Sequence, residues 1–238
     1  KVEHRTYQPT MKAGKSEVEK AVSMIASAKK PLFYCGGGVI NSGPKASKQL
    51  GRLVKLTGAP ITLTLMGLGA YPATEKQFLG MLGMHGTYEA NLAMHDADLI
   101  VAVGARFDDR ITGRLDAFAP NSEKVHIDID PSSINKNVAV DLPIVGDVGS
   151  VLDQMLRVWK DKEFKTNAKA MKAWWSQIND WRTMDCLKYD QSGSVIKPQF
   201  VIERLYENTK DMDCYITTEV GQHQMWAAQF YKFNEPNR

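Results

Sequence analysis

The side chains best suited to bind an anion lie in residues 104–110, which read Gly-Ala-Arg-Phe-Asp-Asp-Arg. A guanidinium group forms paired hydrogen bonds with a carboxylate or phosphate, and the adjacent Asp108 and Asp109 could hold Arg106 and Arg110 in place. A solvated cluster of salt bridges is the alternative interpretation. The segment follows the apolar run 98–103. In a parallel sheet it would lie at the carboxyl end of a strand, where such sheets bind ligands.

Three further segments combine glycine with small, apolar or sulfur-containing residues. Residues 36–38 are three consecutive glycines, which would let backbone N–H groups approach a phosphate, although they do not match the GxGxxG dinucleotide motif. Residues 64–69 are small and apolar and suit a flat heterocycle, or simply form a strand exit. Residues 81–86 place Met84 and His85 between glycines, and His85 could donate to a phosphate or a pyrimidine carbonyl, although a lone histidine is more often structural.

Carboxylates and amides supply the remaining candidates. Asp128 and Asp130 accompany the apolar run 124–129 and Asp147 follows 142–145, where they could accept ribose hydroxyls or cap a helix. Near the end of the chain, Gln222 and His223 follow Gly221 at an expected helix start, which is a place where anions bind. The sequence contains no GxSxG, HExxH or P-loop motif, so hydrolase, zincin and P-loop interpretations have no support from motifs.

Alternating helical and strand-like segments must position these residues. The patterns predict helices at 16–28, 88–95 and 151–159, and a further helix that ends at Gly58. Ser16 and Glu19 have the spacing of a capping box. Apolar runs at 32–35, 60–65, 98–103, 124–129 and 142–145 predict strands buried on both faces. The fold class is therefore α/β, with a doubly wound parallel sheet.

The character of the sequence changes after residue 160. Residues 161–170 are polar, and 171–187 predict a helix whose aromatic face packs on the domain, with Trp174, Trp175, Trp181 and Met184 at loosely helical spacing. A stacking platform for bases is the less frequent alternative. A helix opening at residues 197–199, a strand at 214–218 and a glycine turn at Gly221 then predict the first βα unit of a second α/β domain.

Composition excludes several classes of protein. The chain has 238 residues with 43% hydrophobic and 24% charged residues, as globular proteins do, and its net charge of +3 is too small for a nucleic-acid binder. No apolar run is long enough to span a bilayer. The three cysteines, Cys35, Cys186 and Cys214, lack disulfide or zinc spacing. We therefore expect no nucleic-acid or membrane partner, and a bacterial cytoplasm or an organelle interior as the location.

In their order along the chain, the motifs resemble the catalytic subunit of acetohydroxyacid synthase (acetolactate synthase), a thiamine-diphosphate enzyme. They are residues 31–38 (PLFYCGGG), 64–69 (TLMGLG), 84–86 (MHG), 104–110 (GARFDDR) and 220–226 (VGQHQMW). GARFDDR and VGQHQMW are the specific ones, whereas three glycines alone are not. The resemblance covers nearly the whole chain.

The resemblance implies three sets of site residues. The positions expected to contact FAD are Gly36, Gly37, Gly38, Thr64, Leu65, Met66, Leu82, Gly83, Met84, His85, Gly104, Ala105, Arg106, Asp108, Arg110, Ile111, Asp128, Ile129, Asp147 and Val148. Those expected to contact thiamine diphosphate are Val220, Gly221, Gln222, His223 and Met225. Those expected near the substrate are Met84, Asp109 and Arg110, with Arg110 facing the carboxylate of a 2-oxo acid.

The resemblance also implies an activity and a domain plan. The family condenses pyruvate with pyruvate or 2-oxobutyrate and releases CO2, in branched-chain amino-acid biosynthesis, using thiamine diphosphate, magnesium and a structural FAD. The full-length subunit is implied to form a homodimer or tetramer, with a regulatory small subunit as a further partner. Residues 1–15 correspond to an interdomain linker, 16–158 to the central FAD-associated domain, 159–195 to a helical linker and 196–238 to the incomplete start of the cofactor-binding domain.

Two features of the family are missing from this sequence. Neither the activating glutamate nor the GDG segment with its asparagine, which binds magnesium, is present, so we assign no catalytic residue and no metal ligand. We expect a fragment that is inactive by itself. Two alternatives remain open: another thiamine-diphosphate enzyme, such as a pyruvate oxidase or a 2-oxo acid decarboxylase, and a nucleotide-binding module without catalysis.

Overall fold

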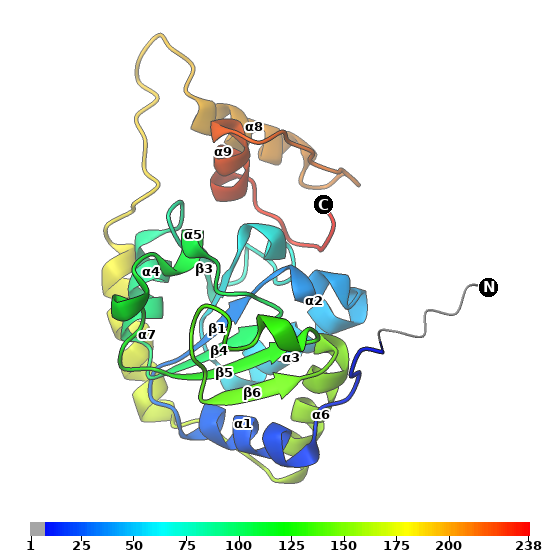
Figure 1. Ribbon diagram of the computed structural model, residues 1–238. Coiled ribbons are helices and arrows are strands. Elements are labelled where there is room, and N and C mark those ends of the chain that lie inside the picture. The colour runs from blue at the N-terminus through cyan, green and yellow to red at the C-terminus, as the bar shows by residue number, and fades with distance from the viewer. Residues whose placement is uncertain (1–7) are drawn as a thin grey trace, which may run out of the picture.

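The computed structural model describes residues 8–238 and centres on a six-stranded, fully parallel sheet (Figure 1). Residues 1–7 of the linker expected at 1–15 lie outside the described part. The strands are β1 (Pro31–Cys35), β2 (Ile61–Leu63), β3 (Phe78–Met81), β4 (Leu99–Val103), β5 (Glu123–Asp128) and β6 (Leu142–Val145). Their order, β3-β2-β1-β4-β5-β6, is that of doubly wound nucleotide-binding sheets, which confirms the predicted fold class.

The helices pack in two groups around this sheet. They are α1 (Lys15–Ser27), α2 (Gly37–Asn41), α3 (Pro44–Thr57), α4 (Tyr88–Asp96), α5 (Asp109–Thr112), α6 (Val148–Asp161), α7 (Ala168–Arg182), α8 (Pro198–Thr209) and α9 (Gln222–Phe230). α6 packs against α1 and α3, while α4 packs against α7. Every residue of β1 and β4 is buried, as expected for central strands with helices on both sides. No helix in residues 8–238 is long and apolar enough to cross a membrane.

Three details of the sheet domain differ from the sequence predictions. The capping box is wrong: α1 begins at Lys15 with Gly14 as its N-cap, and Glu19 instead pairs with Lys162 at 3.0 Å. The second strand is shorter than predicted, because Leu65–Gly67 forms a 3₁₀ turn. The edge strand β3 was not predicted, since its four residues include Gly80 in a left-handed conformation (φ +96°) and give no clear alternating pattern.

The aromatic helix α7 packs as predicted. Trp174 is buried and donates its indole N–H to the Pro31 carbonyl at 3.1 Å, and Trp175 donates to the Gly58 carbonyl at 2.8 Å. These rings anchor α7 at the start of β1 and just before β2. Met184 lies beyond the end of the helix and is exposed, so the prediction that it shares the packing face is wrong.

The C-terminal segment forms two helices and an extended tail rather than a βα unit. Figure 1 shows α8 and α9 above the sheet domain, joined to α7 by a long extended connection. The predicted strand at 214–218 is absent from residues 8–238, because nothing pairs with it except the Arg238 carbonyl, which accepts from Ile216 N–H at 3.0 Å. α9 packs against α8 and β3, and the Phe233 carbonyl accepts from Ala73 N–H. The tail is thereby attached to the sheet domain.

Candidate functional site

The site lies where the strand order reverses, between β1 and β4. Their neighbouring carboxyl ends carry the loops that begin at Gly36 and at Gly104. These loops touch: a Cβ on Gly38 would lie 2.6 Å from the Gly104 Cα, and one on Gly36 would lie 2.4 Å from the Gly104 carbonyl oxygen. Gly104 itself has a left-handed φ of +57°. Gly36 and Gly38 therefore allow the two loops to touch, because a side chain at either position would meet the Gly104 backbone. Their expected contact with FAD stays a prediction.

Gly37 differs from its neighbours. A Cβ there would meet the Met66 Cβ and carbonyl oxygen, both at 3.2 Å, so the loops after β1 and β2 also meet. Thr64 and Leu65 are half-buried at this junction. Met66 is 74% exposed, and Met84, on the loop after β3, is 65% exposed. Exposed methionines at the ligand-binding edge of a parallel sheet are suited to contact a flat, apolar ring.

The three residues expected near the substrate lie together. Met84 N–H donates to the Arg110 carbonyl at 2.8 Å, and a Cβ on Gly83 would lie 2.4 Å from that carbonyl oxygen and 2.8 Å from the Ile111 side chain. Gly83 is held on its other side by Asn91, with which it exchanges two hydrogen bonds of 2.8 and 3.0 Å. The loop of Leu82 to His85 is thus fixed against the first turn of α5.

The charged residues of the 104–110 segment form local ion pairs. Arg106 lies 2.8 Å from Asp108, and Arg110 lies 3.3 Å from Asp109, with all four side chains at least 49% exposed. Exposed pairs of this kind contribute little to stability. Because the cost of breaking them is small, both guanidinium groups can exchange a carboxylate partner for an anionic ligand.

His126 on β5 is a structurally important residue that sequence reasoning missed. It is fully buried, its Nε2 lies 2.7 Å from the Ala105 carbonyl, and its ring meets Phe107 edge-on with centroids 5.2 Å apart. Phe107 has a left-handed φ of +52°, and Nδ1 of His126 has no partner within residues 8–238. Burial lowers the pKa of His126. The neutral ring therefore supports the 104–108 loop. The sequence signal that could have identified His126 is a polar residue within an otherwise apolar strand.

The acidic candidates mostly serve the local backbone. Asp147 is the N-cap of α6: it accepts from Ser150 N–H at 2.9 Å and from the Ser42 hydroxyl at 2.7 Å. Asp130 caps the 3₁₀ turn Pro131–Ser133, which was one of its two expected roles. Asp128 is buried and accepts from Asp130 N–H at 2.9 Å. Ile129 directly follows β5, and Val148 is the buried first residue of α6.

The distal motif lies at the start of α9. Gly221 is the N-cap, and Val220, Gln222 and His223 are exposed, while Met225 is half-buried. At the other end of α9, Gln229 donates to the His85 carbonyl at 2.8 Å. One helix thus connects the segment expected at thiamine diphosphate to the loop expected at FAD. Within residues 8–238, no cluster of three histidine, cysteine, aspartate or glutamate side chains could hold a metal ion.

Known proteins are similar to this chain over most of its length. The model of the family "Thiamine pyrophosphate enzyme, central domain" matches residues 18–155. The acetolactate synthase isozyme 3 large subunit of Escherichia coli strain K12 is 50% identical over 237 residues, which is 100% of this chain and 41% of that protein. The acetolactate synthase large subunit of Haemophilus influenzae is 48% identical over 99% of the chain and 40% of that protein.

A more distant relative gives the same result. The acetolactate synthase of Mycobacterium bovis is 44% identical over 97% of this chain and 37% of that protein. The chain therefore spans about two fifths of the length of the curated relatives it matches. Because the family model covers more than half of its residues, the chain belongs to the thiamine pyrophosphate enzymes and contains their central domain at residues 18–155.

Proposed function

We propose that this chain provides the flavin-binding domain and the diphosphate-binding helix of an acetohydroxyacid synthase, which condenses pyruvate with a second 2-oxo acid and releases CO2. The observation that carries this proposal is that the loop of Met84 and His85 contacts both Arg110 and α9, through the Arg110 carbonyl and the Gln229 side chain. The substrate and cofactor segments expected from the sequence therefore meet around one loop. Relatives named acetolactate synthase, similar over nearly the whole chain, support this assignment.

The residues at the carboxyl edge of the sheet fit a flavin dinucleotide. Met66 and Met84 offer exposed apolar surface for a flat ring, and Arg106 offers an exposed guanidinium group for a phosphate. In this proposal the FAD-contacting residues extend from the 36–38 turn through 64–66, 82–85 and 104–111 to the ends of β5 and β6. FAD has a structural role, so it holds these loops in place and undergoes no required redox cycle.

The start of α9 is the proposed site for thiamine diphosphate. When bound, that cofactor supplies the carbanion stabilisation that the condensation needs. Gln222 and His223 are exposed beside the free N–H groups of the first turn, where they can donate to a diphosphate. Arg110 holds the carboxylate of the 2-oxo acid and so orients its carbonyl carbon. The activating glutamate and the magnesium ligands are proposed to lie in a longer subunit, outside this sequence.

We extend the proposal to the whole enzyme. The full-length subunit forms a homodimer or tetramer and associates with a regulatory small subunit, in agreement with the term "large subunit" in the names of two relatives. The domain boundaries proposed from the sequence, 16–158 for the flavin-associated domain and 196–238 for the start of the next one, complete this plan.

An acetolactate assay tests the function. A full-length subunit containing this sequence should form acetolactate from pyruvate when FAD, thiamine diphosphate and magnesium are present, and the 238-residue chain alone should not. Turnover by the chain alone would contradict the placement of the activating glutamate outside it. Reduction of the flavin by pyruvate at the rate of turnover would instead favour a pyruvate oxidase, and flavin binding without turnover in the full-length protein would favour a nucleotide-binding module.

A further inference from the structure

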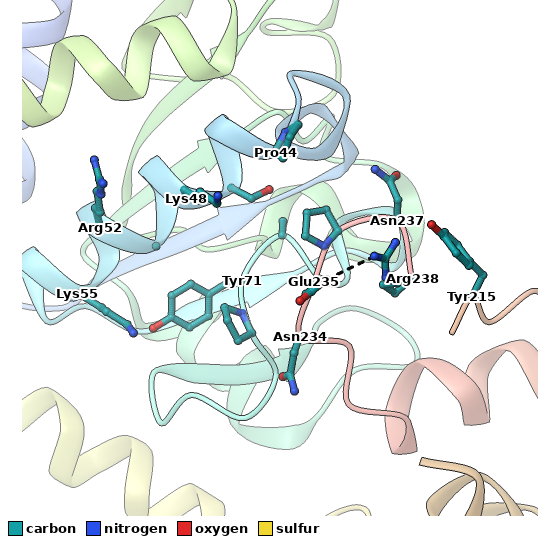
Figure 2. Close-up of a pocket in the computed structure, with 16 residues that line it drawn as sticks. Pro44, Lys48, Arg52, Lys55, Tyr71, Tyr215, Asn234, Glu235, Asn237 and Arg238 are labelled. Atoms are coloured by element: carbon teal, nitrogen blue, oxygen red, sulfur yellow. Dashed lines mark ion pairs between the residues drawn. The ribbon is translucent and has the colours of Figure 1, made fainter. Parts of the chain in front are cut away.

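A cavity of about 830 Å³ lies between α3, the loop of residues 69–72 and the C-terminal tail (Figure 2). We name it the α3 cavity. None of its lining residues belongs to the FAD, thiamine-diphosphate or substrate sets. Its volume lies within the range of small-molecule and cofactor sites.

One face of α3 gives the cavity a positive charge. Lys48, Arg52 and Lys55 have the spacing i, i+4 and i+7, which places them on one side of the helix, opposite the buried Leu50 and Leu53. Figure 2 shows these three side chains along α3, with Lys55 directed toward Tyr71 and Arg52 pointing away from the tail. Lys55 pairs with Glu75 at 2.6 Å, whereas Lys48 and Arg52 have no ion-pair partner within residues 8–238. Two cations are therefore available for a ligand.

Gly51 lies in the interior of α3 between these cations, where it has neither a left-handed φ nor a close neighbour that would exclude a side chain. Among residues 8–238, no atom outside its own helix turn lies within 4 Å of the position that its Cβ would occupy. Glycine in a helix interior is unfavourable relative to alanine, so the fold alone gives no reason for it. The missing side chain opens a recess in the cavity wall.

Ser47 adds a second unexplained feature, a hydroxyl group left unpaired by the described residues. Its hydroxyl oxygen is buried and has no hydrogen-bond partner within residues 8–238, and the residue lines the cavity. Buried hydroxyl groups are usually paired. A ligand oxygen next to Lys48 would give this hydroxyl a partner after rotation about one side-chain bond.

The opposite wall is fixed in place by several contacts. Asn234 Oδ1 accepts from Thr74 N–H and the Thr74 hydroxyl at 3.2 and 3.1 Å, and the guanidinium of Arg238 lies 4.6 Å from the centre of the Tyr215 ring. Arg238 also pairs with Asp213 at 3.0 Å. Pro72 and Pro236 add apolar surface to the lining, whereas the side chain of Tyr71 is fully buried. The cavity thus joins the cationic side of α3 to a wall that combines apolar surface with the exposed carboxylate of Glu235.

We propose that the α3 cavity is a second ligand site, which binds an organic phosphate of nucleotide size. The phosphate groups contact Lys48, the Ser47 hydroxyl and Arg52, whose exposed side chain turns toward them, and the ring lies in the recess at Gly51 against Pro72 and Pro236. This site is distinct from the proposed flavin site. It does not depend on the proposed function.

Isothermal titration calorimetry with ADP, adenosine and pyrophosphate tests the proposal on the purified chain. ADP should bind at one site in the α3 cavity, adenosine and pyrophosphate should each bind at least tenfold more weakly, and added salt should weaken ADP binding. Absence of ADP binding up to millimolar concentration, or equal affinity for adenosine and ADP, would overturn the proposal.

Substitutions on α3 test whether ADP binds in the α3 cavity. Lys48→Glu with Arg52→Glu should weaken ADP binding at least tenfold, whereas Lys169→Glu with Lys172→Glu, the same charge change on the exposed face of α7, should leave it within twofold. Gly51→Leu should remove binding while the melting temperature stays equal or rises, which separates occlusion from misfolding. If Arg106→Glu weakens ADP binding and the α3 variants do not, ADP binds at the flavin site and the proposal is wrong.

Discussion

The backbone N–H of Met84 donates to the carbonyl of Arg110 at 2.8 Å, which joins the loop after β3 to the first turn of α5. Gly83 makes this contact possible, because a Cβ there would lie 2.4 Å from the same carbonyl oxygen. The backbones of Met84 and Arg110 are thereby held together, and both side chains are exposed. An apolar surface and a cation, fixed together, suit a substrate that carries both a methyl group and a carboxylate.

Arg110→Ala tests the proposed substrate contact. A hydrogen bond to a charged group contributes about 1.5–3 kcal/mol, so the variant in a full-length subunit should raise KM for pyruvate by roughly 10-fold to 100-fold. Steady-state kinetics measure this, with Arg114→Ala as a control, because Arg114 is exposed and its one ion-pair partner within residues 8–238 is Asp116. Equal KM values for Arg110→Ala and the unmodified enzyme would refute the role.

Gly104 and Gly51 should respond to alanine in opposite directions. A Cβ on Gly104 would lie 2.6 Å from the Gly38 Cα in a left-handed backbone, so Gly104→Ala should lower the free energy of unfolding by about 2–4 kcal/mol. Gly51→Ala meets open space in a helix and should raise it by about 0.5–1 kcal/mol. Urea unfolding measures both. Equal effects would show that the contact between the β1 and β4 loops does not restrict residue 104.

His126 should make stability depend on pH. Burial lowers the pKa of His126 in the folded chain below the ordinary value of 6.5. At a pH between the folded and the unfolded pKa, the unfolded chain therefore binds more protons than the folded one. The free energy of unfolding should therefore fall as the pH drops below about 6.5, with a slope of up to about 1.4 kcal/mol per pH unit from this residue. At still lower pH, below the folded pKa, this contribution becomes constant.

His126→Gln provides the comparison. The glutamine amide can still donate to the Ala105 carbonyl, but it does not titrate, so this variant should lack that part of the slope. Urea unfolding between pH 5 and pH 8 measures the difference between the two proteins. Parallel pH profiles would contradict the assignment of a neutral, buried imidazole.

The sequence was sufficient where a pattern was long or a contact was local. Fully apolar runs predicted β1 and β4, and the aromatic spacing predicted the packing of Trp174. It was insufficient for β3, whose strand character comes from pairing with β2 and not from its own residues. The prediction of a strand at 214–218 was wrong for a related reason, because an apolar segment forms a strand only when a partner strand pairs with it.

In the candidate site too, local patterns predicted some features, while others depend on tertiary contacts. Spacing alone indicated Arg106 and Arg110, because loops after parallel strands meet at one edge. The contacts of Gly36 and Gly38 with Gly104, and the support that His126 gives to Ala105, depend on three-dimensional proximity between separate strands. No local pattern encodes such contacts.

We propose that the carboxyl edge of this sheet binds FAD. The most direct measurement is a titration of the purified chain with FAD, followed by flavin fluorescence anisotropy, in parallel with Gly37→Val and the control Gly193→Ala. We predict saturable binding that Gly37→Val weakens at least tenfold, because its side chain would displace Met66, and that Gly193→Ala leaves unchanged. Absence of saturable binding, or equal FAD affinity of Gly37→Val and the unmodified chain, would contradict FAD binding at this edge of the sheet.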